Sequence, residues 1–173
     1  MLLRQQLLTP LSKWSIDTLV SEILLHPEEF EGLYQLIFDT NVTVAWRAAW
    51  ACQKISIKEP NWFQENHFNA LSQLTLTTSH GGIQRGCLAI LYNVPMPSEI
   101  DVDLLNACFD WMLSPRSAIA VQAYSMKMAF RFCKLEPDLA SELRMILQEV
   151  NTADYSPGFN STRTNILKAL SNC

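Results

Sequence analysis

The stretch DTNVTVAWRAAWACQKI, residues 39–55, decides the fold of this chain. Its helical part, WRAAWACQKI, aligns with three later segments: QRGCLAILYN, VQAYSMKMAF and TRTNILKALS. The equivalent positions Arg47, Arg85, Gln122 and Arg163 are separated by 38, 37 and 41 residues. A period of about 40 residues accommodates two helices and two turns, so the sequence predicts repeated helix pairs.

Hydrophobic spacing predicts helices along nearly the whole chain. In one early segment, Phe30, Leu33, Tyr34 and Ile37 fall at i, i+3, i+4 and i+7, which is one face of a helix. Prolines separate such segments, since proline ends a helix at the residue before it. After an opening helical segment over residues 1–27, the prediction is four helix pairs, at residues 28–58, 61–94, 101–134 and 138–172.

Composition favours one all-α domain over residues 1–173. Hydrophobic residues make up 49% of the chain and charged residues 17%, which argues against disorder, and only five glycines argue against a many-turned β fold. No apolar run approaches the ~18 residues that span a bilayer, and the start lacks the features of a secretory signal. The five cysteines form no C-x-x-C pair, so we expect buried free thiols and a cytoplasmic protein that binds no membrane.

Charges are sorted by helix. Residues 42–58, 81–94, 116–134 and 157–172 contain ten of the thirteen Lys and Arg residues and none of the seventeen Asp and Glu residues. These stretches are the second helices of the predicted pairs. A chain with a net charge of −4 therefore has a set of basic helices, and such a surface would attract anionic ligands if its cations lay together.

The residues 39–55 resemble the HEAT-repeat pattern. That pattern has an Asp in the turn, an apolar–Arg step and then small residues, here Asp39, Trp46-Arg47, Ala48 and Ala49. The last two pairs are similar to those of small bacterial HEAT-like proteins without assigned activity. The resemblance implies a right-handed α–α superhelix, an armadillo-type solenoid, whose second helices line the concave side. The basic residues would then share one concave face.

Two interpretations of these cations remain open. They can form a groove for an anionic partner, or they can pair with carboxylates of neighbouring elements, as in the Asp/Arg ladder of HEAT-type arrays; Arg47 with Asp39 or Asp110 is one such pairing. Two interpretations are also open for the tryptophans. They can be core side chains between helices, or they can lie at the surface and stack on a partner. Trp50, one turn after Trp46, is the better surface candidate.

Residues for catalysis or metal binding are not recognisable. His26, His67 and His80 belong to no metal-binding motif, and we expect them in connections or at the surface rather than as metal ligands. The helix pairs and groove charge resemble the alkylpurine DNA glycosylases of HEAT-like architecture, but the basic helices contain no carboxylate for their catalytic Asp. No catalytic residue, metal or cofactor is therefore predicted.

The prediction for function is a non-enzymatic interaction module that uses a basic concave face to bind an acidic protein or peptide. The alternative is a nucleic-acid-binding protein related to the HEAT-like glycosylases. The residues predicted to contact the partner are Arg47, Trp50, Lys54, Arg85, Lys127, Arg131 and Arg163.

Overall fold

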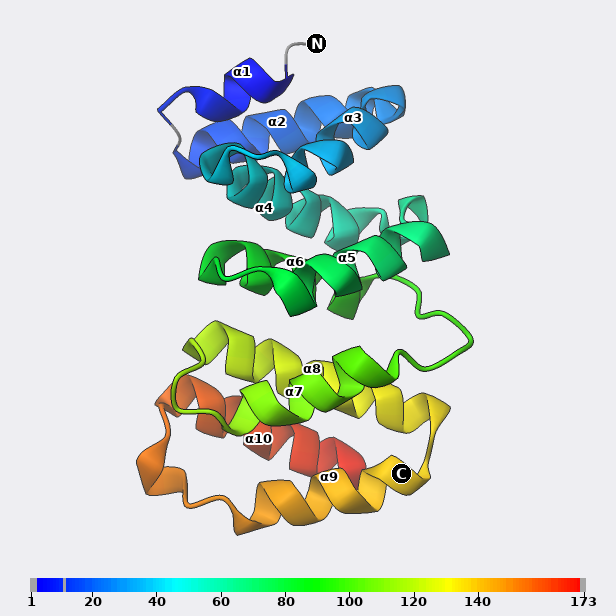
Figure 1. Cartoon of the computed structure of the whole chain (residues 1–173), viewed down its shortest axis with the longest axis vertical. Helices are drawn as coiled ribbons and strands as arrows, with labels where there is room; N and C mark the ends of the chain where they lie inside the picture. Colours follow the sequence, from blue (N-terminus) through cyan, green and yellow to red (C-terminus); the bar gives the residue numbers. More distant parts are fainter. Residues whose placement is uncertain (1–2, 11, 172–173) are drawn as a thin grey trace. The chain divides into compact units, whose positions relative to one another are not determined.

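The computed structural model describes residues 3–10 and 12–171 and divides the chain into two compact units, residues 1–96 and 97–173 (Figure 1). Each unit consists of packed helices, and the described residues contain no β-strand. The all-α solenoid class predicted from the sequence is confirmed. The extension of one domain over residues 1–173 stays a prediction.

Unit 1, residues 1–96, contains the N-terminal segment and the first two pairs. Its helices are α1 (Leu3–Leu8), α2 (Lys13–Leu25), α3 (Phe30–Gln35), α4 (Val42–Lys58), α5 (Glu65–Thr77) and α6 (Gly81–Asn93). One-turn 3₁₀ segments flank α3, at Pro27–Glu29 and Leu36–Phe38. Helix α4 is the centre of the unit, because it packs against α1, α2, α3 and α6.

Unit 2, residues 97–173, contains the last two pairs: α7 (Val102–Leu113), α8 (Ile119–Leu135), α9 (Asp138–Glu149) and α10 (Pro157–Leu170). Helix α8 packs against α7, α9 and α10. The predicted second helices match α4, α6, α8 and α10 closely, because Asn, Pro and Gly residues mark their ends. Three of these helices start at a side chain that accepts a main-chain N–H group: Asn41 caps α4, His80 caps α6 and Ser156 caps α10. Helix α8 starts after Ala118, which provides no such cap.

Small side chains let the second helices of unit 1 approach closely. Ala48, Ala49 and Cys52 on α4 are fully buried, and so is Cys87 on α6. The thiols of Cys52, Cys87, Cys108 and Cys133 are free and buried, as predicted, whereas Cys173 lies outside the described residues. Burial in apolar surroundings disfavours the thiolate, and it raises the pKa of Cys87 to about 12.

One histidine prediction is wrong. His67 is not in a connection or at the surface; its ring is buried on α5, 4.3 Å from the ring of Tyr34 and also near Phe30 and Phe63. His67 Nδ1 accepts the N–H of Gln64 at 3.0 Å, so Nε2 carries the proton and donates to Glu31 at 3.1 Å. The ring is thus a cap and a core side chain at once.

Candidate functional site

Three of the four aligned polar positions on the second helices bind the ends of neighbouring helices. Arg47 Nη1 donates to the carbonyl oxygens of Leu7 at 2.6 Å and Thr9 at 3.0 Å, at the end of α1. Gln122 Nε2 donates to Ser114 O, the cap of α7, at 2.8 Å. The last carbonyl groups of a helix have no hydrogen-bond partner within the helix, and they carry partial negative charge. A side-chain N–H group at this end supplies the missing hydrogen bond and a favourable positive charge.

Arg163 completes this set through a reciprocal arrangement in unit 2. Its Nε donates to Leu147 O and its Nη2 to Gln148 O at 3.5 Å, in the last turn of α9. In return Arg144 of α9 donates from Nη2 to Leu170 O, the last residue of α10. Each of these two helices therefore caps the other.

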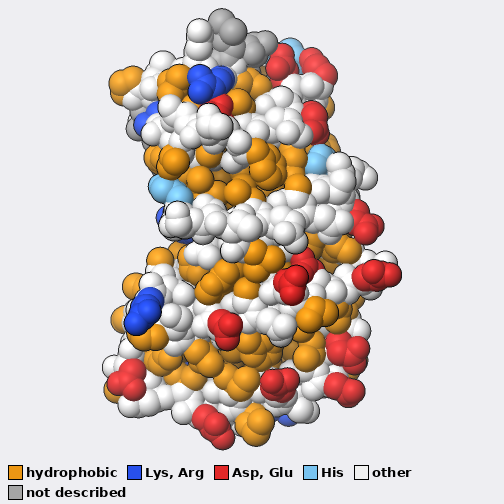
Figure 2. Space-filling model, in the orientation of Figure 1, with side chains coloured by type: hydrophobic (Ala, Val, Ile, Leu, Met, Phe, Trp, Pro, Cys, Tyr) orange, Lys and Arg blue, Asp and Glu red, His pale blue; other side chains and the backbone are white. Residues whose placement is uncertain are grey.

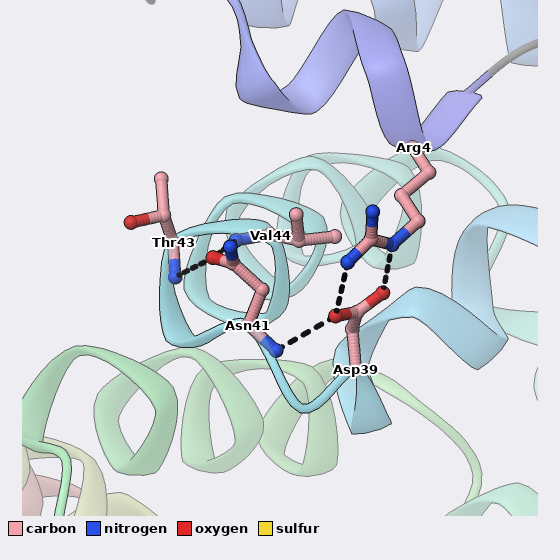
Figure 3. Close-up of polar contacts among 5 residues, drawn as sticks. All are labelled: Arg4, Asp39, Asn41, Thr43 and Val44. Atoms are coloured by element: carbon pink, nitrogen blue, oxygen red, sulfur yellow. Dashed lines mark hydrogen bonds and ion pairs between the residues drawn. The ribbon is translucent and has the colours of Figure 1, made fainter.

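The suggested pairing of Arg47 with Asp39 is wrong, because the guanidinium of Arg47 binds main-chain carbonyls and Asp39 binds another arginine. The pairing of Arg47 with Asp110 of unit 2 stays a prediction. Asp39 pairs with Arg4 of α1: Nε donates to Oδ2 at 2.6 Å and Nη2 to Oδ1 at 3.2 Å (Figure 3). Asp39 Oδ1 also accepts the N–H of Asn41 at 2.7 Å. These contacts, above all those with Arg4, lower the pKa of Asp39 from its usual value.

The outward face of α4 carries a pair of tryptophans. The rings of Trp46 and Trp50 are stacked, with centroids 6.1 Å apart and an interplanar angle of 16°, and both residues are partly exposed. One turn further along, Lys54 Nζ lies 2.8 Å from the Asp17 carboxylate of α2. The positive charge of Lys54 is therefore partly neutralised by Asp17 within unit 1, while the two tryptophan rings remain partly exposed to solvent.

Arg85 is the fourth aligned residue, and it differs from the other three. It lies on α6 and is exposed, and no hydrogen-bond or ionic partner for it occurs among the described residues. Next to it, Gly86 is buried against α4. The arginine is thus held on a closely packed helix with its charge directed to solvent.

The outward face of α8 repeats the combination of aromatic rings and cations. Lys127 Nζ lies 4.8 Å from the ring centroid of Tyr124, and Lys134 Nζ lies 5.4 Å from that of Phe130. Arg131 is partly exposed between them. Tyr124 and Phe130 were not predicted as site residues, although their positions three and four residues before a lysine place each ring beside a cation on a helix.

The first helices present a different surface. Figure 2 shows Asp and Glu side chains among apolar ones on the face formed by α7 and α9, where Lys and Arg are sparse. This face of unit 2 therefore carries carboxylates of the first helices, in line with the sorting of charge by helix seen in the sequence. Whether the basic residues of both units form one continuous groove stays a prediction.

Neither a cluster of metal-ligating side chains nor a membrane-crossing helix is found among the described residues. No three His, Cys, Asp or Glu side chains among them are grouped to hold a metal ion. No helix in the described part of the chain combines the length and the apolar character that crossing a bilayer requires. The second helices carry partly or fully exposed cations beside aromatic rings.

Comparison with known proteins agrees with the packing. A family model described as a HEAT repeat domain matches residues 3–170, nearly the whole chain. No curated protein matches the sequence of this chain.

Proposed function

Because the chain belongs to the HEAT repeat family, we propose that it is a non-enzymatic module that binds an acidic protein or peptide. HEAT repeats commonly mediate protein interactions, and stacked helix pairs offer an extended surface for this role. The observation that carries the proposal is the pairing of partly exposed aromatic rings with cations on α8, supported by the tryptophan pair on α4.

The residues proposed to contact the partner are side chains of the second helices that remain at least partly exposed. They are Trp50 and Lys54 on α4, Arg85 on α6, and Lys127 and Arg131 on α8. Arg47 and Arg163 make intramolecular hydrogen bonds to helix ends, so in this proposal they position helices, and their contact with a partner stays a prediction. A cytoplasmic location belongs to the proposal as well, supported by the free thiols.

An acidic partner fits these side chains for two reasons. Lysine and arginine attract carboxylates at long range, which speeds association and selects against basic partners. Aromatic rings supply apolar area at low entropic cost, so they provide affinity that exposed ion pairs lack. Nucleic acid offers the same two features, phosphates and stacked bases, and is tested as the competing outcome.

The test uses a fluorescein-labelled helical peptide of Glu and Leu, about 16 residues long so that it can form a helix. We expect fluorescence anisotropy to show binding that weakens at least tenfold in the triple variant Arg85→Glu, Lys127→Glu, Arg131→Glu. The matched control, Lys58→Glu, Arg116→Glu, Lys168→Glu, makes the same change in net charge at exposed cations outside the proposed set. Equal weakening in the two folded triple variants would refute a specific site.

The nucleic-acid alternative is measured in parallel. Single- and double-stranded DNA are titrated at two salt concentrations, since binding through Z phosphates weakens with a log–log slope of about −0.9Z on duplex DNA. DNA binding that is tight, steeply salt-dependent and lost in the first triple variant would replace the acidic-peptide proposal.

A further inference from the structure

The first helices of unit 2 enclose a groove that the proposed function does not use. It lies between α7 and α9 and has a volume of about 540 Å³. Its apolar lining includes Phe109 and Leu113 from α7, and Leu139 and Ile146 from α9. This volume falls in the range of about 300–1,000 Å³ that is typical of ligand pockets.

The apolar side chains of the groove pack against the core of unit 2 at its edge and remain partly exposed. On α7 the fully buried positions include Cys108 and Met112, and on α9 Leu143 and Leu147. Three of the four groove side chains are next in sequence to one of these buried residues, and the fourth, Leu139, is one helical turn before Leu143. All four remain partly exposed. Both helices therefore offer apolar area beyond what the core of unit 2 covers.

The rim of the groove is acidic. Asp110 on α7 and Glu142 on α9 line it, and both are exposed without an ionic partner among the described residues. No Lys or Arg lines it in the described chain, and the guanidinium of Arg144, the single cation of α9, donates to Leu170 O at the end of α10. Figure 2 shows this combination of apolar and carboxylate side chains over α7 and α9.

We propose that this groove binds a cationic amphipathic helix of a partner protein. Large apolar side chains on one face of that helix would enter between α7 and α9, as in other helix-in-groove complexes. Its flanking Lys or Arg residues would lie against Asp110 and Glu142, whose charges would repel an acidic segment or a nucleic acid. The site uses the first helices, so it is independent of the basic surface on the second helices.

The probe is a fluorescein-labelled helical peptide of Lys and Leu, again about 16 residues long. Its counterpart of Glu and Leu serves as the comparison probe, whose binding to the basic surface should not weaken when the groove carboxylates are replaced. Anisotropy titrations compare the wild-type chain with the double variant Asp110→Lys, Glu142→Lys. The matched control is Asp103→Lys, Glu149→Lys, which changes the same charges on the same two helices at exposed positions outside the lining. Circular dichroism and thermal unfolding establish that each variant is folded.

We expect the Lys/Leu peptide to bind the wild-type chain and the control variant with affinities within about threefold of each other. The affinity of the groove variant Asp110→Lys, Glu142→Lys for this peptide should fall at least tenfold. The variant Ile146→Asp, which keeps both carboxylates, should also bind the peptide more weakly. Absence of binding to the wild-type chain, or equal loss in the two double variants, overturns the proposal. A homodimer that the groove variant abolishes also overturns it, because the occupant would then be a second copy. Binding of the Glu/Leu peptide is governed by the basic surface, so the two proposals fail separately.

Discussion

Gly86 of α6 lies directly against Ala49 of α4, so close that a methyl group added at Gly86 would be 2.9 Å from the Ala49 Cβ. Cβ atoms in folded proteins essentially never approach this closely. The glycine therefore sets the distance between the two second helices of unit 1. It also explains why this repeat departs from the alanine-rich pattern of residues 46–55.

The substitution Gly86→Ala should destabilise unit 1 in spite of the better helix propensity of alanine. Propensity contributes about 1 kcal/mol in favour of alanine, whereas overpacking a core costs about 1–3 kcal/mol. We expect a lower midpoint in urea unfolding and recovery when Ala49→Gly is added. Gly81→Ala is the control, because no atom lies within 4 Å of the added methyl group. A Gly86→Ala protein more stable than wild type would contradict the close packing.

The reciprocal caps of α9 and α10 give a second prediction. Replacing Arg163 or Arg144 by alanine should lower the free energy of unfolding by about 1–2 kcal/mol, since a charged donor to a part-buried carbonyl is lost. Arg163→Lys should not restore stability fully, because lysine lacks the fork that reaches both Leu147 O and Gln148 O. Lys168→Ala, on the same helix but exposed, should stay within about 0.5 kcal/mol of wild type.

The Arg4–Asp39 pair predicts a dependence on acid pH. Asp39 has a lowered pKa in the folded chain, so its contribution is complete above the unfolded pKa of about 3.9 and disappears as pH falls through the lower folded value. The stability difference between wild type and Asp39→Asn should therefore shrink from pH 6 towards pH 2. Urea unfolding at several pH values measures it.

Tyr34 predicts the opposite dependence at alkaline pH. Its hydroxyl donates to His67 O at 3.1 Å, so Tyr34→Phe should cost about 1 kcal/mol at neutral pH. Burial raises the pKa of Tyr34 above its usual value, so the folded state keeps the proton that the unfolded chain loses above pH ~10. The stability of wild type relative to Tyr34→Phe should thus decline as pH rises above ~10. A constant difference up to pH 11 would show that the hydroxyl ionises equally in both states.

The helix pairs could be predicted because the signals for them are local. Periodic apolar residues and prolines are readable within one segment, and the predicted second helix at residues 42–58 coincides with α4. The burial of four thiols followed from the same periodicity, since Cys52 and its counterparts lie on apolar faces.

The partners of polar side chains could not be predicted, because they depend on which helix ends meet in space. The contact of Arg47 with Leu7 O spans 40 residues, and that carbonyl needs a partner only because α1 ends there. His67 was misplaced for a related reason, since its burial results from rings brought by α3. A single sequence shows the donor but not the acceptor that folding will bring to it.

The reactivity of the four buried cysteines can be used to measure local unfolding. Cys52 and Cys87 lie in unit 1, and Cys108 and Cys133 in unit 2, each shielded from solvent. Such a thiol reacts with a small disulfide reagent only during excursions that separate the helices around it. Mass spectrometry of briefly labelled protein would rank the four cysteines by reactivity. The ranking would show which of the two units unfolds locally more often.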